Sequence, residues 1–254
     1  MSDAQFQRVI TPLAPVRRAA RADAPLDTEA LCGERVEILG EENGWLRVRL
    51  VRDDYIGFMP KDRLGHESAA ATHRVIAPRT LIFPEQNFKT PPIGALTMGA
   101  EVAIIGEDET YARLAEEGYM IAQHLRPLSY KAQDFVAVAE QLVYSPYLWG
   151  GKSSLGIDCS GLLQLSLFIA GKNVPRDSGP QEKALGEPLP AKISFEDVQR
   201  GDLLFWPGHV AIARGYGSMI HATSNVMQVT IENIAKACER IEKGGTPLSS
   251  IRRF

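Results

Sequence analysis

The sequence predicts an α+β protein in which two small antiparallel β-barrels, residues 1–66 and 67–128, precede a mixed domain at residues 129–254. Short strand patterns separated by turn residues fill the first half, and their layout occurs twice. The second half instead places helical patterns before strand patterns, which is typical of segregated α+β domains. A length of 254 residues also exceeds that of a usual single domain.

The first barrel is predicted from strand patterns at residues 35–39, 45–50 and 55–60. Apolar and charged side chains alternate from Trp45 to Leu50, which is the period of a half-buried strand. Residues 41–44, Glu-Glu-Asn-Gly, supply a turn before that strand.

The second barrel repeats this layout at residues 75–77, 81–83, 99–106, 111–114 and 119–121. Residues 122–125, Ala-Gln-His-Leu, then match the end of the first copy at residues 60–64. The pattern indicates an internal repeat of roughly 60 residues, weak in identity but consistent in order.

In the C-terminal half, helices are predicted at residues 134–142 and 162–170, with Gly171 ending the second. Strands are predicted afterwards at residues 202–206, 209–213 and 218–222.

Composition limits the classes of function. A formal net charge of -3 gives no strongly basic surface, so we expect no nucleic-acid partner. No apolar run approaches the ~18 residues of a membrane helix, and the first residues lack the basic start and apolar core of a signal peptide. Three cysteines form an odd set, unlike an exported disulfide framework. We therefore expect a cytoplasmic protein with no membrane association.

The sharpest local feature is Cys159, within Gly-Ile-Asp-Cys-Ser-Gly at residues 156–161, just ahead of an apolar helix. Backbone N–H groups and the positive end of the helix dipole at such a position favour the nucleophilic thiolate. A buried structural cysteine is the alternative on position alone. If residues 215–217 form a hairpin turn, His209 and His221 come together at one end of the sheet, as a base and its orienting partner.

Several ordered motifs carry a family resemblance, namely residues 146–151, 158–162, 175–178, 201–206 and 208–212. Together they resemble the NlpC-type peptidases, a papain-like family that acts on bacterial cell-wall peptides. The two barrels resemble bacterial SH3-like domains. The whole chain is similar to the γ-D-glutamyl-L-diamino acid endopeptidases of murein-peptide recycling.

The resemblance implies specific roles for individual residues. Cys159, His209 and His221 match the catalytic set, and Tyr147 matches a tyrosine that helps to hold the oxyanion. Substrate contacts are implied as well. Asp158, as an ammonium acceptor, with Ser160 and Ser178, would bind a free N-terminus, and the first barrel would contribute Tyr55 and an acidic residue, for which Glu34 is the candidate.

We therefore predict a cysteine peptidase that hydrolyses the γ-D-Glu–diamino acid bond, to meso-diaminopimelate or Lys, in short murein peptides with a free N-terminal L-Ala. The alternatives are an amidase or acyltransferase acting on another wall or lipid bond, and a non-catalytic protein that binds wall peptides. We expect no cofactor and no metal, because a zinc site built from Cys159, His209, His221 and Cys238 lacks the close paired spacing of metal motifs. Cys32 is expected to pack in the first barrel and Cys238 on a C-terminal helix.

Overall fold

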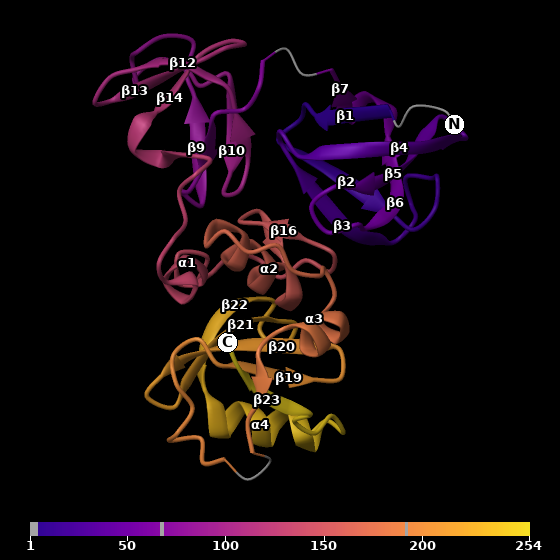
Figure 1. Ribbon diagram of the computed structural model, residues 1–254, viewed down its shortest axis with the longest axis vertical. Helices are drawn as coiled ribbons and strands as arrows, with labels where there is room; N and C mark the ends of the chain where they lie inside the picture. The colour runs from indigo at the N-terminus through magenta and orange to yellow at the C-terminus, as the bar shows by residue number, and fades with distance from the viewer. Residues whose placement is uncertain (1–4, 67–68, 191–192) are drawn as a thin grey trace. The chain divides into compact units, whose positions relative to one another are not determined.

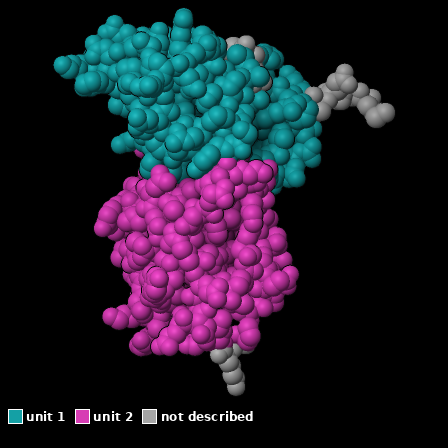
Figure 2. Space-filling model, turned by 60° about the vertical axis from the view of Figure 1, so that its left-hand side comes forward, with its two compact units in different colours: residues 1–130 teal, residues 131–254 magenta. Residues whose placement is uncertain are grey.

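The computed structural model describes residues 5–66, 69–190 and 193–254. The chain forms two compact units, Met1–Tyr130 and Lys131–Phe254, which Figure 2 colours teal and magenta. The predicted boundary between the two barrels adjoins residues 67–68, which lie outside the described residues, as do residues 1–4 of the predicted N-terminal segment. The three-part division of the chain therefore stays a prediction.

The first unit begins with a seven-stranded sheet of order β3-β2-β6-β5-β4-β1-β7. Alternation in the sequence sets which side chains are buried, since Leu46, Val48 and Leu50 are buried whereas Arg47 is exposed. The strands are β1 (Gln5–Val9), β2 (Leu13–Arg17), β3 (Leu26–Leu31), β4 (Arg35–Glu42), β5 (Trp45–Leu50), β6 (Ile56–Pro60) and β7 (Leu64–Gly65).

Smaller sheets follow, of order β11-β8-β15, β12-β13-β14 and β10-β9. Their strands are β8 (His73–Val75), β9 (Arg79–Ile82), β10 (Gly94–Thr97), β11 (Glu101–Val102), β12 (Ile104–Glu107), β13 (Tyr111–Leu114), β14 (Tyr119–Ile121) and β15 (Leu125–Pro127). A 3₁₀ turn precedes a buried leucine in both halves of the unit, at η1 (Lys61–Arg63) before Leu64 and at η2 (Ala122–His124) before Leu125. This shared ending matches the repeat seen in the sequence.

Cys32 does not pack as expected. Its side chain lies against the buried cluster of the second barrel, beside Leu96 and Val102, rather than against the core of the first. The backbone explains this placement, because the N–H of Glu101 donates to the Cys32 carbonyl at 2.9 Å and holds that turn against β11. The prediction for Cys32 was therefore wrong.

The second unit is built on a six-stranded sheet of order β18-β23-β19-β20-β21-β22. Figure 1 shows α1 and α2 on one face of the sheet and α4 on the other. The central strands are buried on both faces, which explains their continuous apolar runs. The elements are α1 (Phe135–Glu140), β16 (Lys152–Ser153), β17 (Gly156–Ile157), α2 (Cys159–Ile169), α3 (Ser178–Ala184), β18 (Glu187–Pro188), β19 (Leu203–Trp206), β20 (His209–Gly215), β21 (Ser218–Thr223), β22 (Gln228–Asn233), α4 (Ile234–Lys243) and β23 (Ser250–Arg253).

Helix α2 starts three residues earlier than the predicted range and has Cys159 as its first residue. Asp158 is the N-cap, and its Oδ1 accepts from the Gly161 N–H at 2.7 Å. Gly171 ends the helix with a positive φ of 80°, and Lys172 N–H donates back to the Leu167 carbonyl at 2.9 Å. Both ends are therefore fixed, and the whole helix is buried. Among the described residues, no helix is long and apolar enough to cross a membrane.

Candidate active site

Cys159 lies at the N-terminus of α2, next to the start of β20. Its side chain is 8% exposed, and the thiol contacts the carbonyl oxygen of Gly208 at 4.0 Å. Gly208 has a positive φ of 77° and immediately precedes His209, the first residue of β20. The tight turn at this glycine therefore brings the histidine strand up to the cysteine.

The two predicted histidines are joined directly. β20 and β21 form the expected hairpin, with Gly215 opposite Ser218. Nε2 of His209 lies 2.8 Å from Nδ1 of His221, and the two rings meet edge to face at 5.1 Å. Nε2 of His221 in turn lies 2.8 Å from Oε2 of Glu232. The result is a continuous hydrogen-bonded series from His209 to a carboxylate.

Burial sets the protonation states of the nucleophile and its base. Together with the nearby Asp158 carboxylate, it raises the pKa of the Cys159 thiol to about 11. It also lowers the pKa of His209 to about 3, with His221 and Arg240 acting in the same direction. The resting pair is therefore a neutral thiol beside a neutral imidazole.

This differs from the thiolate that the helix start favours. The backbone N–H groups of Ser160 and Val210 do lower the pKa of the thiol, but burial and Asp158 outweigh them. In the resting site the cysteine therefore depends on a base to ionise it.

Asp158 is the centre of a buried ion pair. Arg176, only 2% exposed, donates from Nη1 to Oδ1 at 2.9 Å and from Nη2 to Oδ2 at 2.7 Å. Oδ1 also accepts from the Ser160 hydroxyl at 3.2 Å, and Oδ2 accepts from the Gly150 N–H at 2.9 Å. With the Gly161 N–H added, both oxygens of this carboxylate are engaged, as the N-cap of α2 and as the partner of Arg176. Its role as an ammonium acceptor stays a prediction.

Tyr147 and Ser178 lie in the same unit as the cysteine. Burial, with a smaller contribution from the nearby Asp158 carboxylate, raises the pKa of Tyr147 to about 12. Tyr147 forms a parallel β-bridge with Ile157, two residues before Cys159, so the phenol belongs to a segment beside the nucleophile. The raised pKa keeps this phenol a hydrogen-bond donor across the working pH range. Ser178 is the first residue of α3 and is buried, and Gln181 of that helix donates to the Ser160 carbonyl at 3.0 Å.

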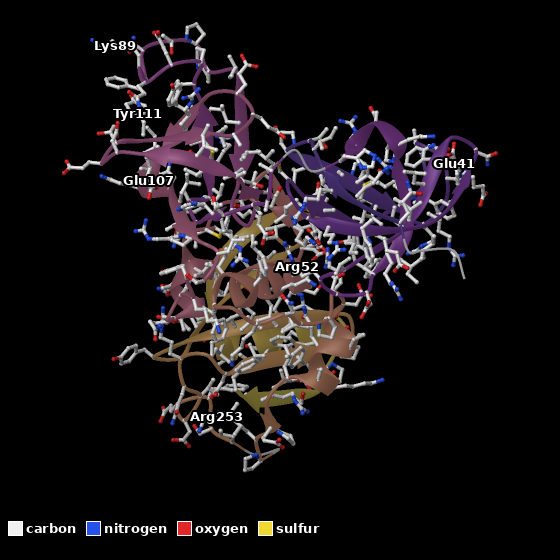
Figure 3. The ribbon with its side chains drawn as sticks, turned by 45° about the horizontal axis from the view of Figure 1, so that its top comes forward. Glu41, Arg52, Lys89, Glu107, Tyr111 and Arg253 are labelled. Carbon is white, nitrogen blue, oxygen red and sulfur yellow. The ribbon has the colours of Figure 1, made fainter. Side chains whose placement is uncertain are left out.

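Tyr55 and Glu34 belong to the other compact unit. Tyr55 packs against the core of the first barrel. Glu34 is 1% exposed, accepts from the Leu31 N–H at 3.1 Å and lies 3.4 Å from Arg52. Figure 3 labels Arg52, which also lies 3.7 Å from Glu101. Glu34 therefore has structural partners of its own, and the substrate roles of both residues stay predictions.

Two further residues of the site, Arg176 and Glu232, were not assigned a role from the sequence. Arg176 stood inside the motif at residues 175–178, but nothing local indicates that its guanidinium holds Asp158. Glu232 belongs to β22, where Thr230 lies opposite His221 and Glu232 lies opposite Met219. An alternating strand at residues 228–233 is the one signal that could have placed it on the histidine face.

Among residues 5–66, 69–190 and 193–254, no group of three or more His, Cys, Asp or Glu side chains is arranged to hold a metal ion. What the site can do chemically is acyl transfer. It combines a thiol, an imidazole oriented by a second imidazole, and a phenol donor near the thiol.

Comparisons with known proteins agree with this geometry. Residues 144–240 match the NlpC/P60 family, and residues 16–64 match the bacterial dipeptidyl-peptidase Sh3 domain. Dipeptidyl-peptidase 6 of Lysinibacillus sphaericus is 30% identical over 250 residues, covering 89% of this chain and 90% of that protein. Gamma-D-glutamyl-L-lysine dipeptidyl-peptidase of Bacillus subtilis is 27% identical and covers 82% of this chain and 76% of its own length.

The fold agrees as well. The crystal structure of an NlpC/P60 family protein from Bacillus cereus superposes with a TM-score of 0.82, at 20% identity, over 98% of this chain and 99% of that one. The predicted fold class, SH3-like barrels followed by a papain-like α+β domain, is thus confirmed.

Proposed function

Because the chain belongs to the NlpC/P60 family of cysteine peptidases, we propose that it hydrolyses the γ-D-glutamyl–diamino acid bond of short murein peptides. The observation that carries this proposal is Cys159 at the start of α2, beside the bonded pair His209 and His221. Three relatives that align over most of their own length support this choice of substrate. All three are dipeptidyl-peptidases, and two of them are γ-D-glutamyl-L-lysine dipeptidyl-peptidases.

In the first step, His209 acts as a general base. Its Nε2 is engaged with His221, so Nδ1 is the ring nitrogen that takes the thiol proton. The sulfur of Cys159 attacks the γ-carbonyl carbon and a C–S bond forms. The carbonyl π-electrons move to oxygen and give a tetrahedral oxyanion.

Collapse of that oxyanion breaks the C–N bond. The imidazolium of His209 returns its proton to the departing amine of the diamino acid, and a thioester remains on Cys159. Water then attacks the thioester carbon as His209 takes its proton. The thiolate leaves and regains the proton, so the site returns to the neutral pair.

Tyr147 is proposed to donate to the oxyanion in both steps. Its raised pKa, about 12, keeps the phenol protonated, which is the state that a donor needs.

We propose that Asp158, Ser160 and Ser178 lie near the N-terminal end of the bound peptide. Ser160 is the second residue of α2, and Ser178 begins α3, whose Gln181 donates to the Ser160 carbonyl at 3.0 Å, which supports a common location for the two serines. We also propose that the reaction serves cytoplasmic recycling of wall peptides. Free thiols at Cys32, Cys159 and Cys238 are compatible with a reducing compartment.

The test compares L-Ala-γ-D-Glu-L-Lys, its meso-diaminopimelate counterpart and the N-acetylated tripeptide, with products identified by mass spectrometry. The expected products are L-Ala-D-Glu and the free diamino acid. The α-linked D-Glu isomer is the matched control and should remain intact. Equal turnover of free and acetylated peptides would overturn recognition of the free N-terminus.

Cleavage of a different wall or lipid amide, with the γ-linked tripeptides left intact, would favour the broader acyltransferase alternative. Cys159→Ala separates catalysis from mere binding. We expect it to retain peptide binding and to lose turnover, whereas a binding protein would show no turnover before the substitution.

A further inference from the structure

Glu232 ends the hydrogen-bonded series that begins at the catalytic base. Its Oε2 lies 2.8 Å from Nε2 of His221 and 2.5 Å from Nη2 of Arg240. His221 has no exposed surface, and the Glu232 side chain is 25% exposed. The carboxylate is therefore held between a buried imidazole and a guanidinium.

The fold brings these groups together on one face of the sheet. Glu232 lies opposite Met219 in the β21–β22 register, and His221 is two residues beyond Met219 on the same strand. Side chains alternate along a strand, so all three share a face. Met219 packs in the cluster that includes α4, which is also the helix that carries Arg240. Residues of β21, β22 and α4 thus meet at the Glu232 carboxylate.

With both histidines neutral, the protons in this series have one consistent arrangement. Hydrogen bonds from His221 and Arg240 lower the pKa of Glu232, so the carboxylate is ionised near neutral pH and can only accept. His221 must then carry its hydrogen on Nε2, which leaves Nδ1 as an acceptor. In that arrangement Nδ1 of His221 accepts from Nε2–H of His209, 2.8 Å away. The neutral His209 ring consequently has its lone pair on Nδ1.

We propose that Glu232 is a positioning residue that acts through His221, fixing the tautomers of both histidines so that Nδ1 of His209 is free to take the Cys159 proton. Its negative charge also offsets the positive charge that His209 acquires during the reaction. The inference rests on the thiol-peptidase chemistry of the proposed function but not on the identity of the peptide.

The charges around the pair act in opposing directions. His209 faces His221 of β21 and Arg240 of α4, which lower its pKa, and Glu232 of β22, which raises it. The thiol faces Asp158, which raises its pKa, and Arg176, which lowers it. Of these groups, Glu232 is the one whose charge favours the imidazolium of His209.

Two substitutions separate the charge of Glu232 from its hydrogen bonds. Glu232→Gln can keep an oxygen that accepts from both His221 and Arg240 while it removes the charge. Glu232→Ala removes both. Glu140→Gln is the matched control, because Glu140 is 26% exposed, also accepts from two arginines, Arg200 and Arg214, and belongs to α1.

The first measurement is the rate of Cys159 alkylation by iodoacetamide from pH 5 to 9, followed on the peptide that contains Cys159 by mass spectrometry so that Cys32 and Cys238 do not contribute. The rate reports formation of the thiolate–imidazolium pair and needs no substrate. We expect Glu232→Gln to slow it about tenfold at pH 7, equal to one unit in the pKa of His209, and Glu232→Ala to slow it by more than that. Glu140→Gln should match the wild type.

The second measurement uses the cleaved tripeptide. Both Glu232 variants should lower kcat and leave KM within about twofold, since Glu232 does not touch the substrate. Circular dichroism and thermal unfolding establish that each variant is folded, and ¹⁵N shifts of the His221 ring should show Nε2 protonated in the wild type but not uniformly in Glu232→Ala.

The proposal is overturned if both Glu232 variants alkylate within twofold of the wild type at every pH. It is also overturned if KM rises while kcat is unchanged, or if Glu140→Gln shows the same loss. If the γ-linked peptides are not cleaved but alkylation responds as expected, the substrate assignment fails and the role of Glu232 stands.

Discussion

Replacing Arg176 by Met should destabilise the C-terminal unit strongly, because it leaves the buried carboxylate of Asp158 without its cationic partner. The guanidinium is only 1% exposed and forms a two-point ion pair with Asp158, whose own side chain is 10% exposed. It also donates to the Ser160 hydroxyl at 2.8 Å and to the Gly151 carbonyl at 3.2 Å. Methionine fills a similar volume but supplies none of these donors.

The expected magnitude follows from what remains around Asp158. Two backbone N–H groups, of Gly150 and Gly161, still donate to its oxygens, so the charge is not left bare. Removing one partner of a buried ion pair usually costs about 3–5 kcal/mol. We expect a loss of about 3–4 kcal/mol in the free energy of unfolding, toward the lower half of that range because of the two backbone donors.

The assay is urea unfolding followed by tryptophan fluorescence in a Trp45→Phe background, which leaves Trp149 and Trp206 as probes of residues 131–254. Arg200→Met is the matched control, since Arg200 is 37% exposed and pairs with Asp134 and Glu140 at the surface. Its loss should cost under about 1 kcal/mol. The double variant Asp158→Asn with Arg176→Met should be more stable than the sum of the single effects implies.

The reasoning that Asp158 depends on Arg176 for its stability in the interior would be refuted if Arg176→Met lowered the free energy of unfolding by less than about 1 kcal/mol. A loss equal to that of Arg200→Met would refute it as well. Additive effects in the double variant would refute the direct coupling of Asp158 and Arg176.

Other substitutions test the site and its packing. Tyr147→Phe should lower kcat on the tripeptide roughly 10²-fold with KM little changed, and an unchanged kcat would exclude it as an oxyanion donor. Burial raises the pKa of Cys159 from an ordinary 9.0 to about 11, so the native state keeps a proton that the unfolded state loses between those values. The contribution of this thiol to the free energy of unfolding is complete below pH 9 and is lost as the pH rises toward 11. Urea unfolding from pH 8 to 11 should therefore show a smaller loss of stability with pH for Cys159→Ala than for the wild type. The same loss in both proteins would contradict this. Gly151→Ala places a Cβ 2.4 Å from the Gly156 carbonyl oxygen and should cost about 1–3 kcal/mol in urea unfolding, whereas Gly179→Ala meets nothing within 4 Å and should cost nothing.

The local features of the fold were predictable from the sequence. Alternation from Trp45 to Leu50 depends on neighbours a few residues away, so β5 follows from a short-range pattern. The body of α2 was predicted in the same way, although its first three residues and its cap, Asp158, were missed. The hairpin of His209 and His221 was also predictable, because glycines at 215 and 217 allow the positive φ values of that turn.

Features that depend on long-range packing were not predictable. The place of Glu232 follows from the β21–β22 register, and a shift of one residue would move it to the other face. The same holds for Arg176, which reaches Asp158 across 18 positions of sequence, and for Cys32, whose neighbours belong to the next barrel. None of these contacts leaves a periodic signal in one sequence.

The ionisation of the nucleophile shows why a local rule can give the wrong net sign. A helix N-terminus favours thiolate, and the N–H of Ser160 acts in that direction, but the burial that completes the site acts more strongly in the other. Deprotonation of Cys159 is then left to His209. A neutral resting pair makes the orientation of that base decisive for the rate.

The two carboxylates of the site therefore have opposite effects on the same proton transfer. Asp158 raises the pKa of the thiol and opposes its ionisation, whereas Glu232 raises the pKa of His209 and favours the imidazolium. Arg176 lowers the pKa of the thiol, and Arg240 lowers that of His209, so each arginine weakens the effect of its own carboxylate. Removing the charge of Asp158 and removing that of Glu232 should thus shift the pH dependence of Cys159 alkylation in opposite directions. Burial raises the pKa of Cys159, so a general loss of structure would expose the thiol and speed its alkylation in both variants. Slower alkylation when the charge of Glu232 is removed therefore distinguishes electrostatic control of the nucleophile from simple disruption of the site.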